Sequence, residues 1–294
     1  MTKKVTDIDV LYCHLLATIL EQGTKVTTRN SEVISHCELP QIVFETFPLV
    51  TIRKPAAMKS IHEMAWFMGG KPRCPDILKD WWDGQLNSYG ELLGGYGEQF
   101  RNFTNVLPDG EIASFDQVKF ILEGLRNNPN SRRLVMTTWN PAEMACITET
   151  NKNPKTPTCC HSVVVQFFVR DDKLSMFSYQ RSADCLLGVP HNWIQSWAML
   201  TYFAYHAGLK VGTMRWSFGD AHIYLEDSHI DIVTKMLEAV TDTDTIQTPS
   251  TFSLKYAPEN PELDGHEVPV FKATDFHIEG DIPDALVTGR PKLL

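Results

Sequence analysis

The chain has 294 residues, 43% of them hydrophobic, and a formal net charge of −9. This length and composition allow a large buried core. Since no repeat, low-complexity tract or Gly/Ser linker marks a boundary, we expect one domain over residues 1–294. The dispersed acidic charge argues against a nucleic-acid-binding surface. No signal-peptide pattern opens the chain, no run reaches membrane-spanning length, and seven irregularly spaced cysteines are typical of reduced thiols, so we expect a cytoplasmic protein without membrane contacts.

Helical and strand-like patterns follow one another along the chain. In order, they are a helix at 8–20, strand-like sequence at 33–52, a helix at 58–68, an irregular region at 71–103, a helix at 115–126, strands at 134–139, 162–170 and 173–179, and an apolar helix at 192–206. The last two strands are joined by an Asp171-Asp172 turn. The final helix is too hydrophobic for the surface. This order predicts an α+β fold, a sheet packed on a buried central helix.

The segment from Cys159 to Asn192 gathers the residue types that carry chemistry. Most cysteines are small core hydrophobes. Cys160 differs, because His161 follows it directly and Arg181 lies on the next predicted strand, and nearby positive charge favours a reactive thiolate. Cys160 is therefore the candidate nucleophile. The alternative of a metal site is disfavoured, since no second Cys/His pair stands at ligand-like spacing.

Four arginines form a candidate anion site. Arg132 and Arg133 are adjacent just before a predicted strand, where neighbours point to opposite faces, so one of them would face inward and need an anion. The alternative is a solvated turn. Together with Arg29 and Arg181 they would suit a phosphate dianion, which guanidinium groups bind in a bidentate way. Sequence spacing leaves open whether the four converge.

Three further positions are ambiguous when taken singly. Glu63 lies on the helix predicted at 58–68, where an acid is either exposed or buried with a shifted pKa and a function. Tyr96 lies in the Gly-rich run GGYGEQFR. His222 and Tyr224 would share one face of the extended segment DAHIY, from which both can grip neighbouring hydroxyl groups.

In combination, these motifs resemble the thymidylate synthase family, which includes the pyrimidine nucleotide hydroxymethylases. The resemblance covers residues 19–280. Its motifs are GT…R ending at residue 29, FPLVT at 47–51, HE..WF at 62–67, YG.Q.R at 96–101, SRR with WN at 131–140, CH at 160–161, YQRS.D..LG.P.N at 179–192 and GD.H.Y at 219–224. The resemblance implies a mixed sheet packed on the buried central helix and a homodimer formed sheet to sheet.

The resemblance also implies roles for single residues. In the family pattern, Cys160 adds to C6 of the pyrimidine, while Glu63 and Tyr96 belong to the network that moves protons at O4 and C5. The implied cradle for the 5′-phosphate consists of Arg29, Arg132, Arg133, Arg181 and Ser182, and in the family pattern the adjacent pair reaches across the dimer interface. Asn192 would recognise the ring, His222 and Tyr224 would bind the sugar, Gln180 and Asp184 would make further substrate contacts, and His161 would make a catalytic contact.

The resemblance also implies a folate-binding side. It would be formed by Asp184, Leu187, Gly188, Trp82 and Arg53.

The implied chemistry uses 5,10-methylenetetrahydrofolate as cosubstrate and no metal. A thiolate adds at C6 of uracil, and C5 takes up the one-carbon unit. Loss of the C5 proton and departure of the folate amine then give an exocyclic methylene group. Hydride from the folate then gives thymidylate, whereas water gives a 5-hydroxymethyl nucleotide. The neutral amide of Asn192 matches the donor at N3 and the acceptor at O4 of uracil, so we expect dUMP rather than a cytosine nucleotide.

The departures from the family pattern concentrate at positions expected near the folate and at positions that control how solvent enters the site. Cys159 replaces a proline, His191 a phenylalanine and Ala56 a histidine, and the basic C-terminal tail is longer. Two usual tryptophans correspond to Trp82 and Gln85 or, with a gap, to Leu78 and Trp81. A polar group near the methylene carbon would admit water. We therefore favour a dUMP hydroxymethylase, with thymidylate synthase as the alternative. A catalytically silent regulatory relative is a third reading, opposed by the intact nucleophile, amide and arginines.

Overall fold

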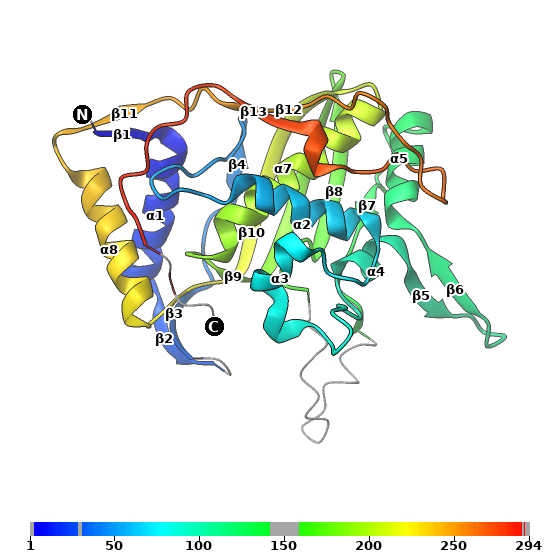
Figure 1. Ribbon diagram of the computed structural model, residues 1–294, viewed down its shortest axis with the longest axis horizontal. Coiled ribbons are helices and arrows are strands. Elements are labelled where there is room, and N and C mark those ends of the chain that lie inside the picture. Colours follow the sequence, from blue (N-terminus) through cyan, green and yellow to red (C-terminus); the bar gives the residue numbers. More distant parts are fainter. Residues whose placement is uncertain (1–2, 29–30, 142–158, 290, 292–294) are drawn as a thin grey trace.

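The computed structural model describes residues 3–28, 31–141, 159–289 and 291. Its centre is a seven-stranded mixed sheet with the order β2-β3-β10-β9-β8-β7, in which β4 also pairs with β10 (Figure 1). The bounds of these strands are β2 Thr24–Thr27, β3 Glu32–His36, β4 Ile42–Phe44, β7 Val135–Met136, β8 Val164–Arg170, β9 Lys173–Asp184 and β10 Lys210–Tyr224. β9 and β10 are parallel, and the other pairs of this sheet are antiparallel.

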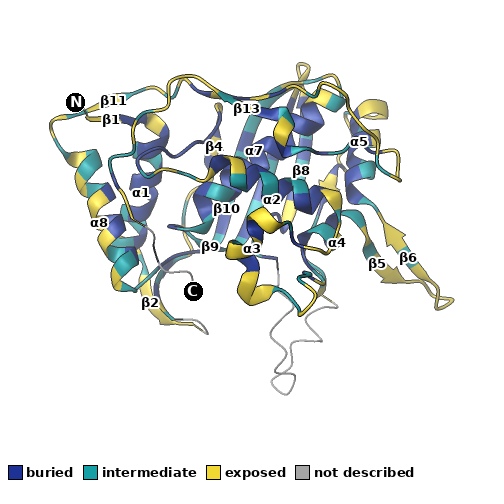
Figure 2. Ribbon diagram, viewed as in Figure 1, coloured by how far each residue is buried: buried dark blue, intermediate teal, exposed yellow. Residues whose placement is uncertain are grey.

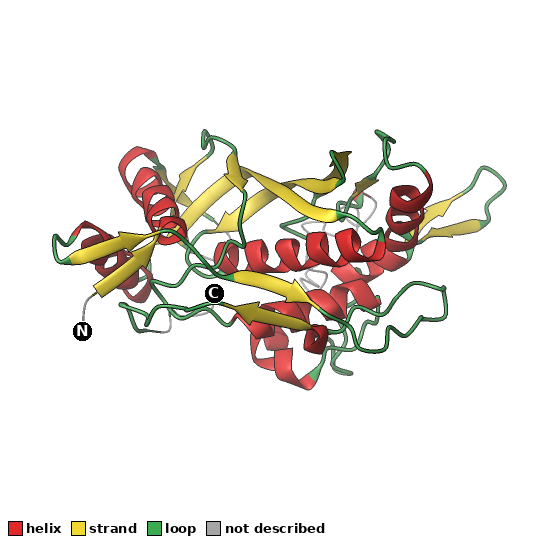
Figure 3. Cartoon of the chain, turned by 90° about the horizontal axis from the view of Figure 1, so that it is seen from above, coloured by secondary structure: helices red, strands yellow, loops and turns green. Residues whose placement is uncertain are grey.

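The helices pack mainly on one side of this sheet. α7 (Gly188–His206) lies against β9 and β10, and α2 (Ala57–Gly69) lies on α7. In the view from above, the far side of β8 and β9 carries no helix among the described residues (Figure 3). In the described residues the other helices are α1 Asp7–Gln22, α3 Lys79–Trp82, α4 Tyr96–Arg101, α5 Gln117–Asn127 and α8 Asp227–Thr241, with 3₁₀ turns at Asp76–Leu78, Asp83–Gln85 and Ala273–Asp275.

Three small two-stranded sheets complete the structure. They pair β1 (Lys3–Thr6) with β11 (Thr245–Thr248), β5 (Phe103–Val106) with β6 (Ile112–Phe115), and β12 (Ser253–Tyr256) with β13 (Phe276–Glu279). The β5–β6 hairpin projects from the body and is largely exposed (Figure 2). No helix in the described ranges combines the length and the apolar character needed to cross a bilayer.

The two faces of the sheet differ in burial, because successive residues of a strand point to opposite faces. In β9, Leu174, Met176, Ser178 and Gln180 are buried against the helices, and the residues between them face the other side. α7 is buried nearly all round, and Trp193 at its centre packs against Phe44. A helix without Asp, Glu, Lys or Arg is suited to this position, because burying it leaves no charge unpaired. The α+β architecture predicted from the sequence is thus confirmed.

Several predicted elements differ in length from those in the structure. Only β3 and β4 form within 33–52, because the buried carboxylate of Asp9 accepts the N–H groups of Thr51 (2.6 Å) and Ile52 (2.8 Å), which are therefore not in a ladder. Within 134–139 only Val135–Met136 is a strand. Here the side-chain amide of Gln117 bonds both the N–H and the C=O of Thr137, which ends the pairing.

The elements that bracket the nucleophile were predicted more closely. The Asp171-Asp172 turn has φ of 48° and 58°, the left-handed pair that a two-residue hairpin needs, and it joins β8 to β9 as expected. β9 is longer than predicted and continues to Asp184. The apolar helix begins at Gly188 rather than at Asn192, because the chain turns into it directly after the end of β9.

Candidate active site

Cys160 lies where the chain enters β8, with its backbone held by the neighbouring strand. Its carbonyl accepts the N–H of Arg181 (2.9 Å), and the N–H of Val163 donates to Tyr179 (3.1 Å). Between them, Ser162 has a φ of 52°. Cys159 is fully buried, whereas Cys160 is partly exposed. The result is a thiol on a fixed backbone that solvent and substrate can reach.

The hydroxyl of Tyr96, at the start of α4, contacts this thiol. It accepts the N–H of Cys160 (2.9 Å) and of His161 (3.3 Å), and it donates toward Sγ of Cys160 at 3.7 Å. Burial raises the pKa of Tyr96 well above its ordinary value, so the phenol stays protonated. Its ring is stacked between Phe67 (4.5 Å) and His161 (4.3 Å). Tyr96 is therefore a fixed donor beside the thiol of Cys160.

His161 does not supply the positive charge that its sequence position suggested. Burial lowers the pKa of His161 to about 3, and Nδ1 lies 3.0 Å from Oγ of Ser162. The imidazole is thus neutral and acts as a packed ring. The nearby cation is Arg181, whose Nε donates to the carbonyl of Cys159 (3.0 Å) and whose guanidinium lies 5.2 Å from the centre of the Trp139 ring.

Glu63 is buried between α2, α3 and α7. Its carboxylate accepts hydrogen bonds from the indole N–H of Trp82 and from the side-chain amide of Gln195. Burial raises the pKa of Glu63 to about 7, against the lowering effect of these two donors. A carboxyl group with this pKa exchanges its proton near neutral pH, as general acid–base chemistry requires. The sequence left open whether Trp81 or Trp82 stands near the acid; it is Trp82 that donates a hydrogen bond to Glu63.

A second group of predicted residues gathers where β9 turns into α7. Oδ1 of Asp184 accepts the N–H groups of Leu186 and Leu187, both at 3.0 Å, and burial raises the pKa of Asp184. A Cβ on Gly188 would lie 3.6 Å from the amide nitrogen of Asn192, so this amide stands directly over the turn. Arg53 reaches the same turn and donates to the carbonyl of Leu186 (2.8 Å).

The predicted sugar clamp lies on the adjacent strand. In β10, His222 is in register with Asp184, and its ring lies 5.3 Å from that of Tyr224. Nδ1 of His222 lies 3.2 Å from Oδ1 of Asp220, which also accepts the hydroxyl of Ser35 (2.9 Å). His222 and Tyr224 therefore share a face, as predicted. On β9, the buried amide of Gln180 donates to the carbonyl of Ser182 (3.1 Å).

The arginine pair is placed differently from the expectation. Arg132 and Arg133 are both exposed in the turn before β7, so the prediction that one faces inward is wrong for the single chain. The reason is that β7 begins only at Val135, and the alternation of a strand does not reach the pair. Arg29 lies outside the described residues, so the structure brings only Arg181 of the four to Cys160.

Comparison with known proteins agrees with this arrangement of side chains around Cys160 and Glu63. The thymidylate synthase family model matches residues 10–287. The chain is also 37% identical, over 239 residues, to a thymidylate synthase of Corynebacterium aurimucosum, an alignment that covers 79% of this chain and 83% of that relative. The chain belongs to the thymidylate synthase family. It is accordingly a one-carbon transferase that acts on a pyrimidine nucleotide, with 5,10-methylenetetrahydrofolate as cosubstrate.

The residues around the turn fit the folate that the thymidylate synthase family uses. A reduced folate combines flat rings that carry N–H donors with an anionic tail. Trp81 and Trp82 supply aromatic surface, the carboxyl of Asp184 can accept from ring N–H groups, and Arg53 supplies a cation. Within the described ranges, three or more His, Cys, Asp or Glu side chains do not gather in a metal-binding arrangement.

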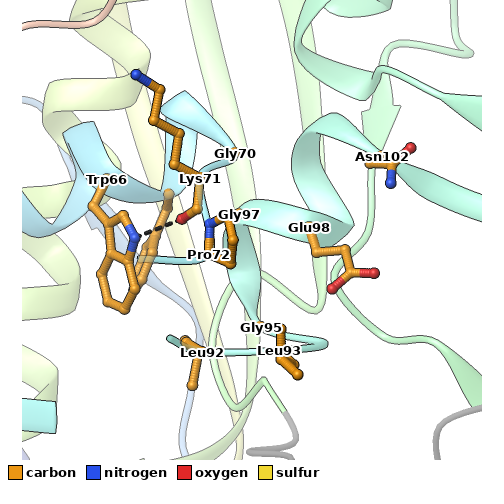
Figure 4. A pocket seen from close by; sticks show the side chains of 11 residues that line it. Trp66, Gly70, Lys71, Pro72, Leu92, Leu93, Gly95, Gly97, Glu98 and Asn102 are labelled. Atoms are coloured by element: carbon orange, nitrogen blue, oxygen red, sulfur yellow. Dashed lines mark hydrogen bonds between the residues drawn. The ribbon is translucent and has the colours of Figure 1, made fainter. Parts of the chain in front are cut away.

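A separate hollow of about 200 Å³ opens between α2 and α4 (Figure 4). It is lined by Trp66, Lys71, Leu92 and Glu98 among others, and the indole N–H of Trp66 donates to the carbonyl of Lys71 (2.7 Å). The hollow reaches Phe67 behind the Tyr96 ring stack. Among the described residues, none that was predicted for the family's site lines it.

Sequence reasoning missed Gln195 and Ser60, which the structure adds to the site. Gln195 holds the carboxylate of Glu63, and Ser60 lies 2.8 Å from the ring of His191. A signal was present for Gln195: it is a polar residue in an otherwise apolar helix, three positions after Asn192 and hence on the same face. Ser60 gave no such signal, because its partner is a residue that departs from the family pattern.

Proposed function

We propose that the chain transfers a one-carbon unit from 5,10-methylenetetrahydrofolate to C5 of dUMP through a covalent bond between Sγ of Cys160 and C6 of the pyrimidine. The observation that carries this proposal is the partly exposed thiol with the Tyr96 hydroxyl 3.7 Å away and Arg181 bonded to its backbone. Addition of the thiolate at C6 turns C5 into an enolate carbon, which is nucleophilic. Donors held in place around the ring stabilise the charge at O4.

Two residues divide the remaining work on the base. Glu63, with a pKa of about 7, takes and returns protons on the side of the ring where C5 and O4 lie. The buried amide of Asn192 meets the N3–O4 edge, where its C=O accepts from N3–H and its NH₂ donates to O4. A cytosine ring presents the reverse pattern, which supports uracil as the base.

For the outcome, we propose hydroxymethylation, which yields 5-hydroxymethyl-dUMP and tetrahydrofolate. It is supported by polar side chains at the folate side of the site, above all His191, which is hydrogen-bonded to Ser60. Thymidylate synthesis is the second candidate, favoured by the name of the Corynebacterium relative. Product mass separates the two, because the hydroxymethyl nucleotide carries one oxygen more than thymidylate. A stoichiometric rise in dihydrofolate absorbance would overturn hydroxymethylation.

The covalent step has its own test in Cys160→Ser. We expect this variant to lose turnover of dUMP, while Cys37→Ser, which changes an exposed thiol elsewhere, keeps it. Unchanged turnover in Cys160→Ser would refute the adduct.

We further propose that the chain forms one domain and works as a homodimer. The two subunits would meet through the face of the sheet that carries no helix among the described residues. Val135, Gln166, Phe177, Arg215 and Val43 stand in one row across this face, in register from β7 to β4. Both valines are exposed, and the ring of Phe168 lies 5.2 Å from the Arg215 guanidinium. A row that combines apolar side chains with a few polar ones suits a self-complementary interface. Sedimentation at micromolar concentration tests it, and a monomer would contradict it.

In the proposed dimer, the exposed arginine pair would bind the phosphate of the nucleotide. Arg132 and Arg133 lie at the β7 edge of the same sheet, from which they would reach the phosphate in the neighbouring subunit. We also propose a cytoplasmic location, supported by the free thiols of the six cysteines among the described residues.

A further inference from the structure

Helices α2 and α7 meet through two polar pairs that follow each other by one helical turn. Oγ of Ser60 lies 2.8 Å from Nδ1 of His191, and the carboxylate of Glu63 accepts from Gln195. Ser60 and Glu63 are three residues apart and His191 and Gln195 are four, so each helix presents one face to the other. Along α2 the two pairs are about 4.5 Å apart. The imidazole therefore lies beside the acid of the active site.

The two consecutive tryptophans of α3 each cover one of these pairs. Trp82 donates its indole N–H to Glu63, and the ring centre of Trp81 lies 4.9 Å from that of His191. The ammonium group of Lys59, on α2, lies 4.6 Å from the centre of the Trp81 ring. Because Trp81 and Ser60 both contact the imidazole, the position of His191 is as fixed as that of Glu63.

The hydrogen bonds determine which nitrogen of His191 carries the proton. The hydroxyl of Ser60 donates to the carbonyl of Ala56 (3.1 Å), so its oxygen must accept from Nδ1–H of His191. The proton is then on Nδ1, and Nε2 carries a lone pair. In the part of the chain that the structure describes, Nε2 has no hydrogen-bond partner. Burial, followed by the charges of Arg53 and Lys59, lowers the pKa of His191 to about 4, so the ring is neutral at neutral pH.

We propose that His191 is the positioning residue that determines the product: its Nε2 accepts a hydrogen bond from the water molecule that adds to the exocyclic methylene carbon, next to Glu63. This inference rests on the proposed hydroxymethylation. The water oxygen bonds to the methylene carbon, and the carbon–carbon π electrons move into the ring as the enolate at O4. The enolate then expels the Cys160 thiolate from C6, which restores the C5–C6 double bond. The proton lost by the water passes to Glu63.

A set of three substitutions at position 191 separates water binding from a purely structural bond between the helices. His191→Phe removes both nitrogens. His191→Asn places an amide where Nδ1 was, so it keeps a bond to Ser60 but has no acceptor at the position of Nε2. His191→Gln places an acceptor near the position of Nε2. The readout is the ratio of 5-hydroxymethyl-dUMP to thymidylate and trapped methylene adduct, measured by mass with a small thiol present as the trap.

We expect His191→Phe and His191→Asn to lower the hydroxymethyl fraction at least about tenfold, which corresponds to about 1.4 kcal/mol in the competing barriers. His191→Gln should keep most of it. Release of tritium from C5-labelled dUMP reports the steps before the branch and should change little in all three. A structural role would instead alter tritium release and leave the product ratio as it is.

The possible failures are distinguishable. If the unaltered protein makes only thymidylate and dihydrofolate, the proposed hydroxymethylation is wrong and the role of His191 falls with it. If the unaltered protein makes the hydroxymethyl nucleotide and His191→Phe and His191→Asn keep its product ratio, only the role of His191 is wrong. Should His191→Phe fail to fold, the comparison of the Asn and Gln variants gives the same decision.

Discussion

The hydroxyl of Tyr96 contacts both the backbone and the sulfur of Cys160, and removing this one oxygen atom tests its role. Tyr96→Phe removes the donor to Sγ of Cys160 and leaves the N–H groups of Cys160 and His161 without this acceptor. We expect turnover to fall by about 10²-fold, the usual effect of losing one fixed donor. The rate at which iodoacetamide alkylates Cys160 should fall as well, because the sulfur loses its hydrogen-bond donor.

The control for this change is Tyr89→Phe, since Tyr89 is exposed. Its turnover and alkylation rate should match those of the unaltered protein. An unchanged alkylation rate in Tyr96→Phe would show that the phenol does not act on the sulfur.

Glu63 links activity and stability to pH. Its pKa of about 7 lies above the ordinary value of 4.5, because burial disfavours the charged form. The folded state therefore binds the proton more tightly than the unfolded state. The resulting stabilisation is fully present below pH 4.5 and is lost as the pH rises to 7, and it amounts to on the order of 3 kcal/mol.

Glu63→Gln mimics the protonated form and should remove this dependence. We expect its free energy of unfolding to change less than that of the unaltered protein between pH 4.5 and 7, as measured by denaturant titration at several pH values. Turnover should fall by about 10²- to 10⁴-fold, since the acid–base group is gone. Parallel stability curves for the two proteins would contradict the raised pKa.

Asp220 orients the predicted sugar clamp without needing to touch the nucleotide. Its Oδ1 accepts from Ser35 and contacts Nδ1 of His222, which leaves Nε2 of His222 for the 3′-hydroxyl. We expect Asp220→Ala to raise KM for dUMP by about tenfold, the loss of one hydrogen bond to a charged group. Binding of the 2′,3′-dideoxy analogue should stay the same. An equal loss for both nucleotides would mean that Asp220 only supports the fold.

At the scale of elements, the buried carboxylate of Asp9 connects α1 to the segment that leads into α2. It accepts from the N–H and hydroxyl of Thr6 (both 2.9 Å), from the N–H and hydroxyl of Thr51 (2.6 and 2.7 Å) and from the N–H of Ile52 (2.8 Å). Asp9→Ala leaves three buried backbone N–H groups unpaired. We expect it to lower the free energy of unfolding by about 3 to 5 kcal/mol.

Glu21→Ala, at the exposed end of the same helix, is the matched control and should stay within about 0.5 kcal/mol. Denaturant unfolding of the two variants measures the difference. A loss in Asp9→Ala no larger than in the control would show that the segment 47–52 is held by its apolar contacts alone.

Asp9 also shows why some elements could not be read from sequence. Segments whose own pattern decides their structure, such as the apolar helix α7 and the hairpin of β8 and β9, were predicted well, because burial and turn chemistry are local signals. The strand predicted at 33–52 failed in its second half, where a carboxylate some 40 positions earlier replaces the sheet ladder. Gln117 shortens β7 by the same kind of long-range bond.

The features of the candidate site also fall into two groups, those that local sequence predicts and those that depend on residues distant in the chain. The approach of Arg181 to Cys160 and the shared face of His222 and Tyr224 follow from strand geometry, so the sequence could predict both. The neutral state of His161 and the bond between Glu63 and Gln195 depend on what folds over them, and no spacing in the sequence shows that. The arginine pair, finally, is exposed in the single chain, and its proposed role depends on the proposed dimer.

At the scale of the whole molecule, the proposed dimer predicts that two inactive variants restore each other. If Arg132 and Arg133 serve the neighbouring subunit, each site combines Cys160 of one chain with the arginines of the other. Cys160→Ser lacks the proposed nucleophile at both of its sites, and the double variant Arg132→Ala/Arg133→Ala lacks two arginines of the phosphate cradle at both. In a mixed dimer, the chain with the intact thiol faces the chain with the intact arginines, and one complete site forms.

Equal amounts of the two variants, unfolded together and refolded, should therefore regain about a quarter of the unaltered activity, because half of the dimers are mixed and each has one complete site of two. Each variant refolded alone is the control and should stay inactive. The regained activity should also show the unaltered KM for dUMP, since the complete site lacks nothing. A mixture that stays as inactive as its parts would place the arginine pair in its own chain's site, whereas full activity of the arginine variant alone would place the pair outside any site.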